Sequence, residues 1–200
     1  PADLESLVDQ SWLRVHAHRF TLHELMRQYC DEKLDQEHQS EMDEGAEEVY
    51  RRHCAYFAGM TGVEEPTLNW QRESMALLTP DYGNLEAAWR WAVAHDDFAA
   101  TRQMMNSLYY FAEMTGWLGA MLPFFENAAV ALRRRWEQTD SAGSQRQAAA
   151  LLLSNILYIR LMLYLRLGWL TRAQNCLDEM RAVLAAAEHT LAMLLAAARN

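Results

Sequence analysis

The sequence predicts an all-α protein that carries one short β-hairpin near its N-terminus and continues as an array of antiparallel helical hairpins. Three observations support this fold class. The 200 residues include only 4 prolines and 8 glycines, and β-branched residues are scarce. Apolar residues recur three or four positions apart along most of the chain, which is the period of an α-helix. The tripeptide Gly-Trp-Leu occurs at 116–118 and again at 168–170, which indicates an internal repeat.

Residues 1–34 are expected to form a helix, a β-hairpin and a second helix. Apolar spacing predicts the first helix from Leu4 to Leu13, and residues 15–22 are expected to form the hairpin. The run Thr21-Leu22-His23-Glu24 has the spacing of a capping box, so a second helix should begin there with His23 in its first turn. The unpaired N–H groups and dipole of a helix start hold anions such as phosphate. We interpret this segment as the C-terminal part of a winged-helix domain.

The rest of the chain is expected to be helical after a linker. The charged residues 35–48 predict that linker, residues 49–96 a connecting helical region, and residues 97–200 the helical repeats. Turn signals at Asp96-Asp97, Gly116 and Gly168 predict the points where antiparallel helices meet. Short glycine connections between helices are typical of tetratricopeptide-like arrays, although the repeat spacing here is longer than usual.

Four runs of residues carry a resemblance to a known family: Leu7–Leu13 (LVDQSWL), Arg19–Tyr29 (RFTLHELMRQY), Arg52–Phe57 (RHCAYF) and Asp81–Ala92 (DYGNLEAAWRWA). They resemble the end of the winged-helix module, and the helical region after it, in STAND-type signalling NTPases. That family includes bacterial transcriptional regulators and immune receptors of plants and animals. The tripeptide Leu22-His23-Glu24 lies at the place of the family's Met-His-Asp-like motif.

The resemblance implies that this chain is a non-catalytic regulatory or sensor part of a larger ATPase. In the resting state of such a protein, His23 would contact the β-phosphate of ADP held by the NTPase domain of the same chain. An inducer or partner protein on the helical repeats would then permit exchange of ADP for ATP. We expect no cofactor in this fragment itself. The alternative is a stand-alone helical-repeat scaffold for protein–protein interaction, with no link to a nucleotide and with His23 as a structural helix-start residue.

Composition and charge argue against several other functions for this chain. There is no Gly-x-x-x-x-Gly-Lys-Ser/Thr loop, and Lys33 is the only lysine, so the chain is not expected to be an enzyme alone. A formal charge of −9 argues against direct nucleic-acid binding, and we interpret Arg133-Arg134-Arg135 as a solvated helix end. Arg160 and Arg166 interrupt the longest apolar run, which predicts no membrane span. Three widely spaced cysteines are typical of reduced thiols in a cytoplasmic protein.

Aromatic side chains are concentrated in the repeat region. Most of them lie at core positions of their helices, but Trp91, Tyr109, Trp117 and Tyr158 are the candidates for lining a groove that binds the inducer or partner.

The hairpin itself suggests two further kinds of site. His16, His18, His23 and Cys30 lack the paired spacing of zinc ligands, so we expect no metal. A DNA-binding wing built on Arg14, His16, His18 and Arg19 ranks last, because the preceding helix is acidic rather than basic.

Overall fold

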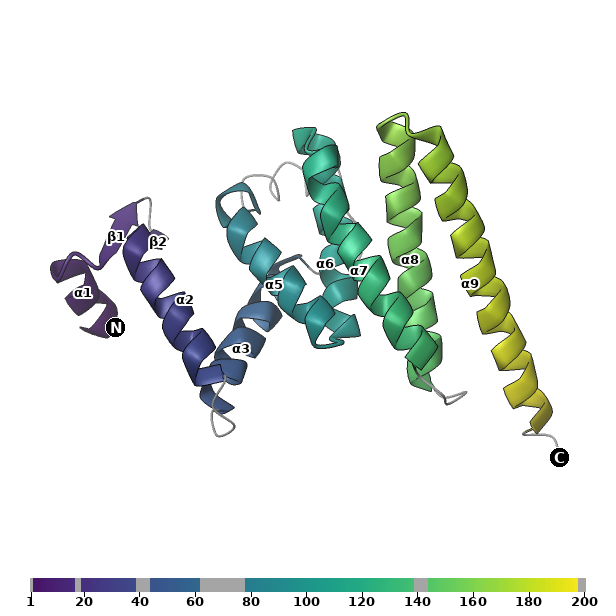
Figure 1. Ribbon diagram of the computed structural model, residues 1–200. Coiled ribbons are helices and arrows are strands. Elements are labelled where there is room, and N and C mark those ends of the chain that lie inside the picture. The colour runs from purple at the N-terminus through teal and green to yellow at the C-terminus, as the bar shows by residue number, and fades with distance from the viewer. Residues whose placement is uncertain (1, 17–18, 39–43, 62–77, 139–143, 198–200) are drawn as a thin grey trace. The chain divides into compact units, whose positions relative to one another are not determined.

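The structure is a computed structural model that describes residues 2–16, 19–38, 44–61, 78–138 and 144–197 (Figure 1). These residues form eight α-helices, one 3-10 turn and one two-stranded antiparallel sheet, which confirms the predicted fold class. The chain divides into two compact units, Pro1–Arg51 and Arg52–Asn200. This division differs from the four expected segments, because the break falls within a helix rather than before or after one.

The first unit begins with a helix, a hairpin and a helix, as expected. Helix α1 (Ala2–Asp9) is followed by β1 (Leu13–His16), β2 (Arg19–Leu22) and α2 (Glu24–His38). The strands are antiparallel, and Leu13 pairs with Leu22 while His16 pairs with Arg19. The first helix ends earlier than predicted because Ser11 takes a left-handed backbone conformation, with φ of 61°, and turns the chain into β1.

The expected linker at residues 35–48 is helical at both ends. Helix α2 continues to His38, and α3 (Glu44–Thr61) begins before residue 48, while residues 39–43 lie outside the described part of the chain. Charged residues three or four apart stabilise these helices, because Arg27 pairs with Glu24 and Asp31, and Arg51 pairs with Glu48.

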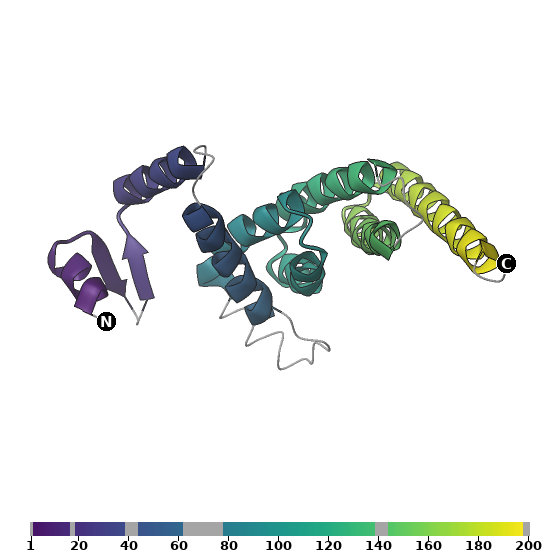
Figure 2. The same ribbon diagram turned by 90° about the horizontal axis from the view of Figure 1, so that it is seen from below.

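The second unit is built from helices that pack against their neighbours in the chain. After α3 and the 3-10 turn Thr79–Asp81 come α5 (Tyr82–Ala94), α6 (Phe98–Thr115), α7 (Leu118–Gln138), α8 (Ser144–Arg166) and α9 (Leu170–Ala197). Consecutive helices from α5 to α9 are antiparallel and in contact, and α5 also contacts α7 while α6 contacts α8. The array therefore has two layers, with α5, α7 and α9 in one and α6 and α8 in the other (Figure 2).

The helical turns fall where the sequence placed them. Gly116 ends α6 with φ of 76°, and Gly168 follows α8 with φ of 74°; both values lie in the left-handed region that glycine adopts without strain. Asp97 caps α6 by accepting a hydrogen bond from the N–H of Ala100 at 2.9 Å. The three predicted meeting points of antiparallel helices are thus confirmed.

One apolar core runs from the end of α3 to α9. Trp89, Phe125 and Leu153 are fully buried in it, and the indole N–H of Trp89 donates to the Phe124 carbonyl at 3.3 Å. Helix α5 shares this core with α6 and α7.

Helix α8 is long and contains an extended apolar stretch. By length and composition alone, Gln145–Arg166 could cross a membrane, although Arg160 lies inside it. More than half of the helix is buried in the helical unit, which is also the behaviour of a core helix.

Candidate functional site

His23 occupies the connection between β2 and α2. Its backbone carbonyl accepts the first helical hydrogen bond, from the N–H of Arg27 at 2.9 Å. Its ring nitrogen Nδ1 accepts from the N–H of Leu25 at 3.4 Å, so the histidine is itself the N-cap of α2. The side chain is exposed.

The predicted capping box does not form. Thr21 is held in β2, where it pairs with Arg14, and this extended backbone prevents the helix from starting there. The Glu24 carboxylate instead accepts hydrogen bonds from Arg27 and Gln28, and the Arg27 bond lowers the pKa of Glu24. His23 therefore lies one position before the helix, rather than in its first turn.

The N-cap bond fixes what the imidazole can do. When Nδ1 accepts a hydrogen bond, the neutral ring carries its hydrogen on Nε2. That N–H is a donor that an external acceptor such as a phosphate oxygen can use. The bond to Leu25 is long and hence weak, so it orients the ring without locking it.

The four aromatic residues expected to line one groove lie in separate places. Trp91 of α5 is half-buried and stacks on His95 at 4.3 Å, and its indole nitrogen has no hydrogen-bond partner within the described ranges. Tyr109 of α6 is half-buried and donates its hydroxyl to Glu113 at 2.7 Å. Trp117, in the α6–α7 turn, and Tyr158, on α8, are both exposed. None of the four lines either of the cavities described next.

The larger cavity is an open groove of about 550 Å³ between α5 and α7. Its α5 wall is formed by Tyr82, Glu86, Trp89, Arg90, Val93 and Ala94, and its α7 wall by Ala120, Pro123, Phe124, Asn127, Ala128 and Ala131. We call this the α5–α7 groove. Ala120, Ala128 and Ala131 on the α7 wall have small side chains, and these positions share one face of the helix.

Aromatic rings form one end of the α5–α7 groove. The Tyr82 ring lies 6.2 Å from Phe124 and 5.4 Å from Trp117, so Trp117 supports the groove wall without lining the cavity. Burial raises the pKa of Tyr82, which keeps its hydroxyl protonated as a donor at neutral pH. Glu86 and Arg90 form an ion pair on the same wall. The groove thus combines an apolar floor with a few polar groups, which suits a small organic ligand or a peptide side chain.

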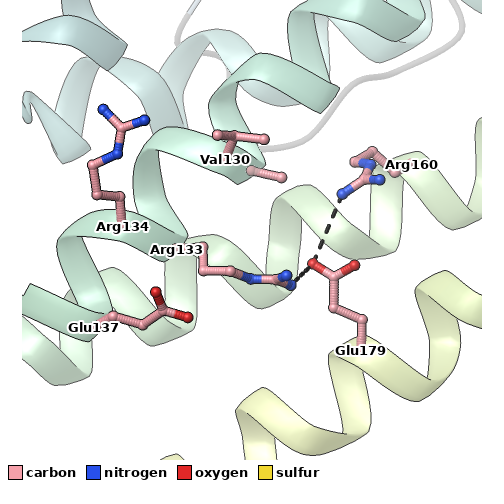
Figure 3. A pocket seen from close by; sticks show the side chains of 7 residues that line it. Val130, Arg133, Arg134, Glu137, Arg160 and Glu179 are labelled. Atoms are coloured by element: carbon pink, nitrogen blue, oxygen red, sulfur yellow. Dashed lines mark hydrogen bonds and ion pairs between the residues drawn. The ribbon is translucent and has the colours of Figure 1, made fainter.

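The second cavity, of about 350 Å³, lies between α7, α8 and α9 (Figure 3). It is lined by Ala129, Val130, Arg133, Arg134 and Glu137 of α7, by Arg160 of α8 and by Glu179 of α9. Arg133 and Arg160 both point toward Glu179 (Figure 3). We call this the arginine cavity. Its residues come from three helices, so no local sequence pattern predicts this cavity.

Among the described residues, no three His, Cys, Asp or Glu side chains lie close enough together to hold a metal ion. His16 lies in the hairpin and His23 at the start of α2, while His18 lies outside the described residues.

Comparison with family models, with curated proteins and with solved structures finds no match to this chain.

Proposed function

We propose that this chain is the non-catalytic sensor part of a STAND-type signalling NTPase that regulates transcription. Its helical unit binds an inducer or a partner protein, and the observation that carries this proposal is the α5–α7 groove. The groove is large enough for a small ligand and is walled by aromatic rings and by the Glu86–Arg90 pair. It lies in the part of the chain where such regulators would carry their sensor.

His23 supplies the proposed link to the nucleotide. It is exposed at the start of α2, and its Nε2–H can donate a hydrogen bond to a phosphate oxygen of ADP. The NTPase domain of the same chain would hold the rest of the nucleotide. The fragment then restrains the resting state and needs no cofactor of its own.

The proposed mechanism is a shift between two states. An inducer in the α5–α7 groove favours the open state only if it binds that state more tightly than the resting one. The open state loses the His23 contact, and ADP exchanges for ATP. This scheme belongs in the cytoplasm, and the charge of −9 favours protein or small-molecule partners over nucleic acid.

The first test is His23→Ala in the full-length protein. Losing a hydrogen bond to a charged group costs about 1–3 kcal/mol, so ADP retention should weaken roughly ten- to hundredfold. Nucleotide content after purification and reporter output without inducer are the measurements. Unchanged ADP content together with unchanged basal output would show that His23 only caps α2.

The second test fills the α5–α7 groove. Ala131→Phe places a ring in the cavity, so the response to inducer should be lost while resting ADP content stays normal. The control is Ala99→Phe, at an exposed position of α6 outside the groove. A normal inducer response in the Ala131 variant would remove the groove from the proposal.

The alternative, a stand-alone protein–protein scaffold, is favoured by one face of α8. Leu151, Tyr158 and Leu165 are seven residues apart and are 55%, 53% and 47% exposed, so they form an apolar stripe on one side of the helix. Under this alternative, Leu151→Glu with Leu165→Glu abolishes partner binding and His23→Ala changes nothing. A Gly-x-x-x-x-Gly-Lys-Ser/Thr segment encoded upstream of Pro1 would favour the sensor instead.

A further inference from the structure

The arginine cavity concentrates positive charge in an acidic protein. Three arginines and two glutamates line it, which leaves a formal excess of one positive charge, whereas the whole chain carries −9. Arg134 points away from Glu179, so the guanidinium groups of Arg133 and Arg160 are the ones that meet in the cavity (Figure 3).

Arg160 is held in a largely buried position with few partners. Its side chain is only 16% exposed, and its Nε–H is buried with no hydrogen-bond partner in the part of the chain that the structure describes. One terminal nitrogen donates to the Tyr164 hydroxyl at 3.2 Å, and that hydroxyl donates to Glu126 at 2.7 Å. A guanidinium has five N–H donors, and leaving buried donors unpaired is costly.

Two arginines share the Glu179 carboxylate. Glu179 makes its close hydrogen bond with Arg133, while the Nη1 of Arg160 lies 3.9 Å from the same oxygen, beyond hydrogen-bond distance. Glu179 therefore compensates the charge of Arg160 only in part. The guanidinium keeps donors that no described residue accepts, and a cavity of about 350 Å³ opens beside it.

We propose that the arginine cavity binds a small anion, a carboxylate or a phosphate, through Arg160 and Arg133. Both guanidinium groups offer the planar pair of donors that matches either anion. Glu179 acts as an internal competitor, because its carboxylate already occupies the donors that the ligand needs. Since Glu179 lies on α9, an anion that displaces it also loosens the tie between α9 and the α7–α8 pair.

This proposal does not depend on the nucleotide scheme, and it is tested on the chain as it stands. The probes are inorganic phosphate and succinate, titrated at constant ionic strength and neutral pH. The readouts are calorimetry and the Nε–H signals of the arginines in an NMR spectrum. We expect saturable, millimolar or tighter binding that shifts the Arg160 signal. Binding of phosphate alone or of succinate alone identifies the ligand class, and both support the proposal.

Two variants separate a binding site from a structural ion pair. Arg160→Met should weaken binding at least tenfold, because it removes the main anion contact. Glu179→Gln should tighten binding several-fold, because it removes the competitor and leaves both arginines. Arg102→Gln, at an exposed position of α6, is the control and should change nothing.

The outcomes that overturn the proposal are equally direct. The absence of saturable binding of either probe to the unmodified chain would do so without reference to any variant. Weaker rather than tighter binding in Glu179→Gln, with the circular dichroism unchanged, would show that Arg133, Arg160 and Glu179 serve only to hold α9.

Discussion

Replacing the turn glycines by alanine tests the helical array most sharply, because the structure isolates a single cause. Gly116 and Gly168 have positive φ, yet an added Cβ would meet no atom within 4 Å at either position. The cost of Gly116→Ala or Gly168→Ala is therefore conformational alone, about 1–2 kcal/mol for a left-handed residue. For a chain of this size the melting temperature should fall by roughly 2–8 °C.

The matched control is Gly119, three residues after Gly116. Gly119 is in the first turn of α7, with ordinary helical backbone and equally open surroundings. Gly119→Ala should stabilise the protein by about 0.4–1 kcal/mol, because it restricts the unfolded chain. Thermal melts followed by circular dichroism compare the three variants. If Gly116→Ala and Gly119→Ala change the melting temperature in the same direction, the left-handed turn after α6 is refuted.

Three further predictions concern the helical unit. Burial and the Glu113 carboxylate raise the pKa of Tyr109 to about 12, so its stabilising contribution is complete below the unfolded value of 10 and is lost as pH rises to 12. Urea titrations should show this loss in the native chain and a flatter pH profile in Tyr109→Phe. Burial raises the pKa of Cys54 to about 11 and also raises that of Cys176, so both thiols should react with a disulfide reagent only on unfolding, whereas half-buried Cys30 reacts first. Leu153→Ala, at a fully buried position of α8, should cost about 2–5 kcal/mol by urea unfolding.

Local signals predicted most of the fold. A glycine after a helix and an aspartate before one mark the helix ends through contacts with residues only a few positions away. The turns at Asp97, Gly116 and Gly168 therefore lie where the sequence predicts them. The sequence also predicted the hairpin, because residues 15–22 lie between two segments with helical apolar spacing. These features depend on backbone geometry that the residues themselves dictate.

The errors arose where a distant partner decides the outcome. Thr21 has the spacing of a helix cap, but its pairing with Arg14 across the hairpin keeps its backbone extended. His23 is therefore the N-cap of α2. The predicted aromatic groove rested on composition, and its four residues line neither of the two cavities described above. In the structure, the α5–α7 groove exists because Ala120 and Ala131 are small, and absent side-chain volume is hard to read from a list of large residues.

The three adjacent arginines Arg133, Arg134 and Arg135 lie in three different environments in the structure. Successive residues on a helix point about 100° apart, so three adjacent arginines cannot share one environment. Arg133 pairs with Glu179 of α9, Arg134 points away from that glutamate, and the Nε of Arg135 lies 3.2 Å from Asp96 in the α5–α6 turn. Interpreting the run as a solvated helix end treated the three residues as one group. Arg133 connects α7 to α9, whereas Arg135 connects it to the α5–α6 turn. The packing of α8 and α9 against α7 brings Arg133 beside Arg160, and this second guanidinium makes the ion pair a candidate anion site.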